Sequence, residues 1–126
     1  MDNKEIVIDG VPYVRKSQLA VGGDGPTSGL PCVLVRSFAA GVHFGYLGEE
    51  KFTAAGKVVV LLKTRRVWYW NGAASLSQMA VEGVKKPDDC KFSMEVERNE
   101  IVQVIETLPL TEKALLNLYG VAIWKQ

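Results

Sequence analysis

The residues best suited to binding chemistry lie together in the middle of the chain. The segment Lys63–Ser77, KTRRVWYWNGAASLS, holds two adjacent arginines and two of the three tryptophans. Guanidinium groups match phosphate oxygens and stack on aromatic planes, and tryptophan and tyrosine rings stack on nucleobases. Backbone N–H groups at a glycine turn and at a helix start could add contacts to an anion. These residue types are the parts of a nucleotide pocket.

A role in the interior is the alternative for the same residues, with both tryptophans filling the core beneath a helix. In an extended strand alternate residues share a face, so Arg66, Trp68 and Trp70 would lie on one side of the sheet. Arg65 and Tyr69 would lie on the other side. A face that carries arginine and two tryptophans suits a subunit interface or a ligand wall, where these types are enriched.

A second candidate patch precedes this segment. Arg36 interrupts the apolar run CVLVRSF, which is costly unless the guanidinium reaches solvent or a partner. A ligand phosphate is one possible partner, and a carboxylate such as Glu106 is the other. His43 is the single histidine of the chain. It could act as a base but has no obvious nucleophile, and a structural or surface role is the alternative.

The two patches together give the predicted ligand-binding set. Its members are Arg36, His43, Arg65, Arg66, Trp68, Tyr69, Trp70, Asn71 and Ser75. In this prediction the arginines hold phosphates and the aromatic rings stack on a base. The asparagine and the serine supply further polar contacts.

Signatures of catalysis and of metal binding are missing from the sequence. It contains no G-x-S-x-G elbow, and the glycine-rich stretch 22–29 lacks the lysine followed by Ser or Thr of a phosphate loop. Cys32 and Cys90 have no metal-ligand spacing, and we interpret them as free thiols of a reducing cytosol. We therefore predict that the protein is not an enzyme and has no catalytic residue, cofactor or metal.

Composition narrows the class of partner. The chain has 126 residues, of which 48% are hydrophobic and 23% charged, as expected of one globular domain. Fifteen basic and fourteen acidic residues give a net charge of +1, which argues against a nucleic-acid partner that requires a basic excess. No apolar run approaches the roughly 20 residues that cross a bilayer, and the start MDNKEIVIDG does not resemble a signal peptide. We expect a cytoplasmic protein with no membrane partner.

The elements that would position the candidate residues indicate a small α+β domain. Residues 1–16 are predicted to form an N-terminal β-hairpin appendage with its turn at Asp9-Gly10. Residues 17–30 form a Gly/Pro-rich linker, and residues 31–126 form the α+β core domain.

Within the core domain the pattern predicts a small, mostly antiparallel β-sheet with two short helices. Strands are expected at residues 32–38, 42–47, 57–70, 90–96 and 100–108. Residues 48–56 are predicted to form a polar turn, and Gly45 indicates a bulge or a close approach of another backbone or a ligand. Ser75 and Gly83 would cap the ends of the first helix, and Thr111 would cap the start of the second.

From about Val33 to the C-terminus the sequence resembles a family of short phage and prophage proteins of uncharacterised function. The segments that carry the resemblance are VRSFAAGVHFGYL, RRVWYWNGAASLSQMAVEGV, DDCKF, and IVQVIETLPLTEKA followed by GVAIW. The chain is also similar to the Thoeris anti-defence sponges of phages. Those are small proteins with a β-sheet and C-terminal helices, which assemble as oligomers and sequester a cyclic ADP-ribose isomer or, in some cases, cyclic oligonucleotides. The resemblance implies a class of function and a homo-oligomer, and it assigns no binding positions.

The resemblance and the residues together predict a phage-encoded, non-catalytic sponge in the host cytosol. It would bind a small anionic nucleotide near a subunit interface of a homo-oligomer and so counter bacterial defence. A phage protein-interaction module, either an assembly factor or an inhibitor of a host protein, could use the same aromatic patch as a hot spot. A single-stranded nucleic-acid binder could also use it, although the balanced charge weighs against that class.

Overall fold

The computed structural model describes residues 5–8, 11–14 and 27–125 of the chain. Near the N-terminus, β1 (Glu5–Ile8) pairs antiparallel with β2 (Val11–Val14), which confirms the predicted hairpin. The predicted turn at Asp9-Gly10 and residues 17–26 of the predicted linker lie outside the described residues.

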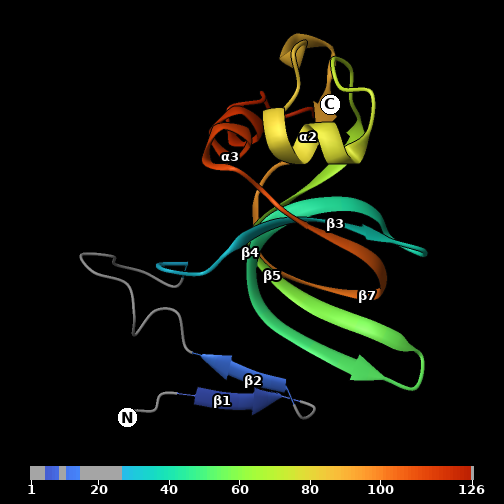
Figure 1. Ribbon diagram of the computed structural model, residues 1–126. Helices are drawn as coiled ribbons and strands as arrows, with labels where there is room; N and C mark the ends of the chain where they lie inside the picture. Colours follow the sequence, from blue (N-terminus) through green and yellow to red (C-terminus); the bar gives the residue numbers. More distant parts are fainter. Residues whose placement is uncertain (1–4, 9–10, 15–26, 126) are drawn as a thin grey trace.

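The main sheet has five strands, namely β3 (Cys32–Ser37), β4 (Gly41–Thr53), β5 (Gly56–Tyr69), β6 (Lys91–Phe92) and β7 (Val96–Pro109). Their order is β4-β3-β7-β5-β6, and every pair is antiparallel. Because β4 also pairs with β5, the strands β3, β4, β5 and β7 close on one another (Figure 1). With the helices α2 (Leu76–Glu82) and α3 (Glu112–Tyr119), this confirms the predicted α+β class.

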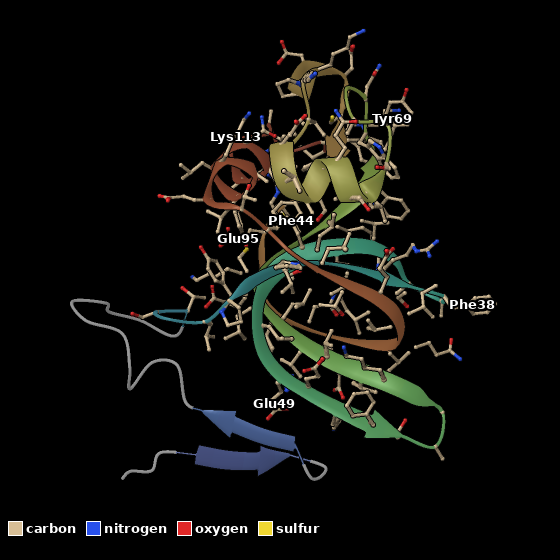
Figure 2. The ribbon with its side chains drawn as sticks, viewed as in Figure 1. Phe38, Phe44, Glu49, Tyr69, Glu95 and Lys113 are labelled. Carbon is tan, nitrogen blue, oxygen red and sulfur yellow. The ribbon has the colours of Figure 1, made fainter. Side chains whose placement is uncertain are left out.

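Both faces of the sheet contribute residues to a hydrophobic core, and the two cores are separate. Strand side chains alternate between faces, so the neighbours Leu34 and Val35 belong to different cores. One core lies among the closed strands and contains Val33, Val35, Leu47, Val59, Leu61, Ile101 and Val104. The other lies between the sheet and the helices, and Figure 2 shows Phe44 of this core directly beneath them. Two buried faces explain the unbroken apolar runs in β3 and β5.

The helices begin and end at the residues that the sequence indicated. The Ser75 hydroxyl accepts a hydrogen bond from the Gln78 N–H at the start of α2, and Gly83 ends this helix at a φ of 79°. At the start of α3, the Thr111 hydroxyl accepts from the Ala114 N–H and donates to the Val81 carbonyl, 2.7 Å away. This second bond joins the two helices. Within the described part of the chain, no helix has the length and apolar character to cross a bilayer.

The strand boundaries differ from the predictions in two places. Strand β4 continues through the predicted polar turn at residues 48–56 as far as Thr53. The polar residues there belong to a strand because they reach solvent or pair across the sheet, as Glu50 does with Lys57. The predicted strand at residues 90–96 is only Lys91–Phe92, and β7 begins earlier than expected, at Val96.

The predicted close approach at Gly45 is confirmed. The register of β4 against β5 shifts between Phe44 and Tyr46. A Cβ atom on Gly45 would lie 2.9 Å from the Thr64 Cβ and 3.0 Å from the Leu62 carbonyl oxygen. Only glycine fits here without movement of β5, so Gly45 lets β4 approach closely the part of β5 that carries the arginines.

Candidate functional site

Strand β5 sends its two adjacent arginines to opposite faces of the sheet. In the register of β4 against β5, Arg66 lies opposite His43 and Arg65 lies opposite Phe44. Phe44 belongs to the core beneath the helices, and Arg65 lies on that side. Arg66 lies on the other side, where a pocket opens.

This pocket has a volume of about 200 Å³. Its walls come from β4, β5, the start of β7 and the segment 93–95 that precedes β7. The lining residues are His43, Thr64, Arg65, Arg66, Trp68, Ser93, Val96 and Asn99. Three of the predicted site residues therefore meet here, namely His43, Arg66 and Trp68. Arg65 also borders the pocket, although its guanidinium bonds to carbonyls on the helix side of the sheet.

Arg66 and Trp68 form a stacked pair at this pocket. The guanidinium carbon lies 5.1 Å from the centre of the indole ring, and the indole is 57% exposed. The backbone of Arg66 is fixed, because its N–H donates to the Ser93 hydroxyl and its carbonyl accepts from the Ser93 N–H, both at 2.8 Å. No carboxylate among the described residues forms an ion pair with the guanidinium. Its N–H donors are therefore available to an anion.

His43 is a buried wall residue with one unmatched nitrogen. Its ring is 1% exposed, and its Nε2 lies 2.9 Å from the Ala40 carbonyl oxygen, so this nitrogen carries the proton and donates it. Burial lowers the pKa of His43; the bond to Ala40 opposes this, and the nearby charge of Arg66 adds to it. The ring is therefore neutral at pH 7, and Nδ1 is an acceptor. This nitrogen has no hydrogen-bond partner among the described residues.

Arg65 is a structural residue of the interior. It is 3% exposed, and its guanidinium lies 5.5 Å from the centre of the Phe92 ring. Its nitrogens donate to the backbone carbonyls of Ser93, Leu118, Tyr119, Val121 and Ala122, at distances from 2.7 to 3.5 Å. Burial lowers its pKa. Because its donors already bind these carbonyls, Arg65 is not part of the phosphate site that we propose.

Arg36 lies outside the pocket, and its predicted carboxylate partner is confirmed. Its Nε lies 3.3 Å from a carboxylate oxygen of Glu106 on the neighbouring strand β7. Both side chains reach solvent. An ion pair with an internal partner explains an arginine in this apolar strand without any ligand.

The prediction that Trp70 shares a face with Arg66 and Trp68 is wrong. The register of β5 against β6 shifts between Val67 and Tyr69, and β5 ends at Tyr69. This irregularity turns Trp70 towards the core beneath the helices, where it is partly buried. Alternation cannot be extrapolated across such a shift.

The remaining predicted residues lie around the end of β5 and do not line the pocket. Tyr69, which is labelled in Figure 2, is 51% exposed. The backbone N–H of Asn71 lies 3.4 Å from the Cys90 sulfur, and Ser75 caps α2. Cys90 and Cys32 are both buried free thiols, as the sequence indicated.

Four pocket residues were not predicted, namely Thr64, Ser93, Val96 and Asn99. Alternation back from Arg66 along β5 could have indicated Thr64. The other three come from a segment some 30 positions later in the chain. The pairing of β7 with β5 brings Val96 and Asn99 to the pocket, and Ser93 is placed there by its hydrogen bonds to the backbone of Arg66. No local pattern in the sequence marks them.

The arrangement suits binding to an anion or to a planar ring. His43 bonds to a backbone carbonyl, and the described residues contain no cluster of His, Cys, Asp and Glu that could hold a metal ion. The stacked guanidinium supplies charge and a flat surface, and the half-exposed indole supplies a second flat surface.

A family model described as "Domain of unknown function (DUF6948)" matches residues 30–118. No curated protein and no solved structure gives a significant match to the chain. The expected membership of a family without an assigned function is confirmed, whereas phage origin and a role against bacterial defence stay predictions. Since the match covers well over half of the sequence, the chain belongs to the DUF6948 family.

Proposed function

We propose that this protein is a non-catalytic binding protein that sequesters a small anionic nucleotide. The observation that carries the proposal is the Arg66–Trp68 pair, with a guanidinium that has no carboxylate partner among the described residues and an indole that is 57% exposed. In this role Arg66 binds a phosphate, and Trp68 stacks on the base. Sequestration requires tight binding with slow release and no turnover.

The neighbouring groups fit the same role. Ser93 and Asn99 give the pocket polar walls, and the neutral His43 places an unmatched acceptor in the wall behind Arg66. An unmatched buried acceptor is unusual in a folded protein. If ligand binding brings a hydrogen-bond donor to Nδ1, the occupied state gains a hydrogen bond that the empty state lacks. The donor could come from the ligand or from a shifted Arg66 side chain.

The size of the pocket limits how a nucleotide can bind. Pockets for small molecules usually measure about 300–1,000 Å³, and this pocket measures about 200 Å³. It can enclose a base or a phosphate with part of its sugar. The rest of the ligand would extend over the exposed indole, or it would need a wall from a second subunit, in line with the proposed homo-oligomer.

The ligand that we propose is a cyclic ADP-ribose isomer or a cyclic oligonucleotide. This finer proposal rests on the resemblance to the Thoeris anti-defence sponges, which also makes the host cytosol the proposed location and a phage the proposed source. The pocket itself supports only the chemistry that these molecules share, which is a planar base close to a phosphate.

A melting-temperature screen tests the proposal. The purified protein is mixed with cyclic ADP-ribose isomers and with cyclic di- and trinucleotides, and its thermal unfolding is followed. A ligand at 100 times its dissociation constant should stabilise the folded state by about 2.7 kcal/mol. The shift should be lost in Trp68→Ala and kept in Arg36→Ala, which removes an exposed arginine outside the pocket. If no nucleotide raises the melting temperature, the proposal is wrong.

A protein-interaction module is the second candidate. Trp68 and Tyr69 are adjacent and about half exposed, and Met94 near the pocket is 55% exposed. Exposed aromatic residues beside an arginine are typical of a hot spot for a polypeptide. Capture of one stoichiometric host protein, lost in Trp68→Ala, together with no small molecule released on heating, would favour this candidate over the first.

A further inference from the structure

One edge of β7 pairs with another strand along only part of its length. Along its first part, from Val96 to Val104, β7 pairs with β5. On its other edge β7 pairs with β3, but only from Val104 to Pro109. Just before that ladder, the Ser37 hydroxyl donates to the Val102 carbonyl and the Phe38 N–H donates to the Gln103 carbonyl. From Val96 to Ile101, this second edge meets no strand among the residues that the structure describes.

The outward face of this stretch has a self-complementary sequence. Ile101 points into the core and is 2% exposed. Alternate residues of this stretch are all exposed, namely Val96, Arg98, Glu100 and Val102. The order valine, arginine, glutamate, valine is symmetric about Asn99, and the two charges on either side of this centre have opposite signs.

We propose that two copies of the chain pair antiparallel through β7, with the two-fold axis at Asn99. Arg98 of each copy then lies opposite Glu100 of the other, and Val96 lies opposite Val102. Opposite charges and apolar side chains placed directly across a strand pair are favourable, and like charges there are unfavourable. An isologous contact of this kind closes on itself as a dimer.

The charges select this register over its neighbours. An axis at Arg98 would place the two arginines opposite each other, and an axis at Glu100 would do the same with the two glutamates. An axis between two residues would pair residues of opposite alternation, and would turn the apolar Ile101 face against the outward face of the partner. The Ser37 hydroxyl already donates to the Val102 carbonyl, and Gln103 has a φ of 54°. The backbone pairing therefore ends at Ile101, and Val102 contributes only its side chain.

One internal contact competes weakly for Glu100. A carboxylate oxygen of Glu100 lies 3.8 Å from the Lys51 ammonium, and both side chains are close to half exposed. Surface pairs of this length contribute little to stability. The second oxygen of the carboxylate remains available to Arg98 of the second copy.

The dimer would place a new wall beside the candidate pocket. Val96 and Asn99 line the pocket, and in the proposed pairing the strand of the second copy runs next to both. The pairing through β7 thus names the contact surface of the homo-oligomer, and in this respect it rests on the proposed function. The pairing itself needs no nucleotide, so it can be tested with no nucleotide present and can fail separately from nucleotide binding.

Charge reversal tests the pairing. Sedimentation of the full chain over a wide concentration range, with no nucleotide present, should show a monomer–dimer equilibrium. Arg98→Glu should weaken the dimer by at least about tenfold, because each copy then presents a glutamate opposite Glu100. Glu100→Arg should weaken it similarly. The double variant R98E/E100R restores opposite charges across the axis and should recover most of the lost affinity.

Lys113→Glu on α3 is the matched control, since this residue is exposed and the variant changes the net charge by the same amount as Arg98→Glu. It should sediment like the natural chain. Circular dichroism of each variant checks that the fold is kept. A natural chain that is monomeric at every concentration overturns the proposal. So does a dimer that neither single reversal weakens, or one that the double reversal does not restore.

Discussion

Arg65 and Arg66 are neighbours in the sequence and have opposite environments. Arg65 is 3% exposed and donates hydrogen bonds to carbonyls at the end of α3 and beyond it. Arg66 is partly exposed and stacks on Trp68 at a pocket. One guanidinium therefore holds the C-terminal segment to the sheet, and the other has its donors available.

The comparison shows that residue type alone does not distinguish a binding arginine from a structural one. The difference arises from the face of β5 on which each side chain lies, and the helices cover only one of the two faces. The two arginines are nevertheless connected, because Arg65 donates to the Ser93 carbonyl at 2.7 Å and Arg66 bonds to the same residue through its backbone. Arg65 thus positions the wall against which Arg66 lies.

The largest expected effect is on stability, at the buried member of the pair. Arg65→Met should lower the free energy of unfolding by about 3 kcal/mol or more, because it leaves several buried carbonyls without a donor. Arg66→Met should cost less than about 1 kcal/mol, since it removes only a stacking contact at the surface. Urea unfolding of both variants measures the difference. Equal losses would show that the two arginines do not differ as described.

The next largest loss of stability is expected at Gly45, where β4 approaches β5 closely beside both arginines. Gly45→Ala should cost about 1–3 kcal/mol, because its methyl group would lie 2.9 Å from the Thr64 Cβ and 3.0 Å from the backbone of Leu62. Gly48→Ala is the matched control. Its methyl group would meet mainly the flexible Leu62 side chain at 3.3 Å, so a smaller loss is expected in the same unfolding experiment. A larger loss for Gly48→Ala would contradict the assigned register.

The smallest expected effect is on the pH dependence of stability, and it comes from His43 in the pocket wall. Burial lowers the folded-state pKa of His43 below its ordinary value of 6.5. Below about pH 6.5 the unfolded chain therefore binds a proton that the folded chain resists, and stability falls as the pH falls. His43 is the single histidine of the chain, so His43→Gln should flatten stability between pH 7.5 and 5, compared by thermal unfolding. An unchanged slope in the variant would contradict a buried, neutral ring.

Local signals predicted much of the fold. The cap at Ser75, the stop at Gly83 and the cap at Thr111 depend on short-range chemistry, and all three are confirmed. The polar stretch 48–53 misled the prediction, because a strand that reaches solvent can carry charges that pair across the sheet. The register shift near Tyr69 misled the assignment of Trp70, because one irregular residue reverses the face on which every later side chain of the strand lies.

The pocket was only half predictable, for a related reason. His43, Arg66 and Trp68 come from a stretch whose composition indicated binding. Asn99 reaches the same pocket through the pairing of β7 with β5, and Ser93 through its hydrogen bonds to Arg66. No local pattern reveals either contact. The different roles of Arg65 and Arg66 also required the structure, since they depend on which face the helices cover.

The most direct test of the central claim is calorimetric titration of the natural chain, Arg66→Ala and Arg36→Ala with a cyclic ADP-ribose isomer and a cyclic dinucleotide. The account predicts saturable binding by the natural chain, a loss of about tenfold or more in Arg66→Ala from the missing charged hydrogen bonds, and little change in Arg36→Ala. Binding that is equally strong in all three proteins, or absent from the natural chain, would contradict it.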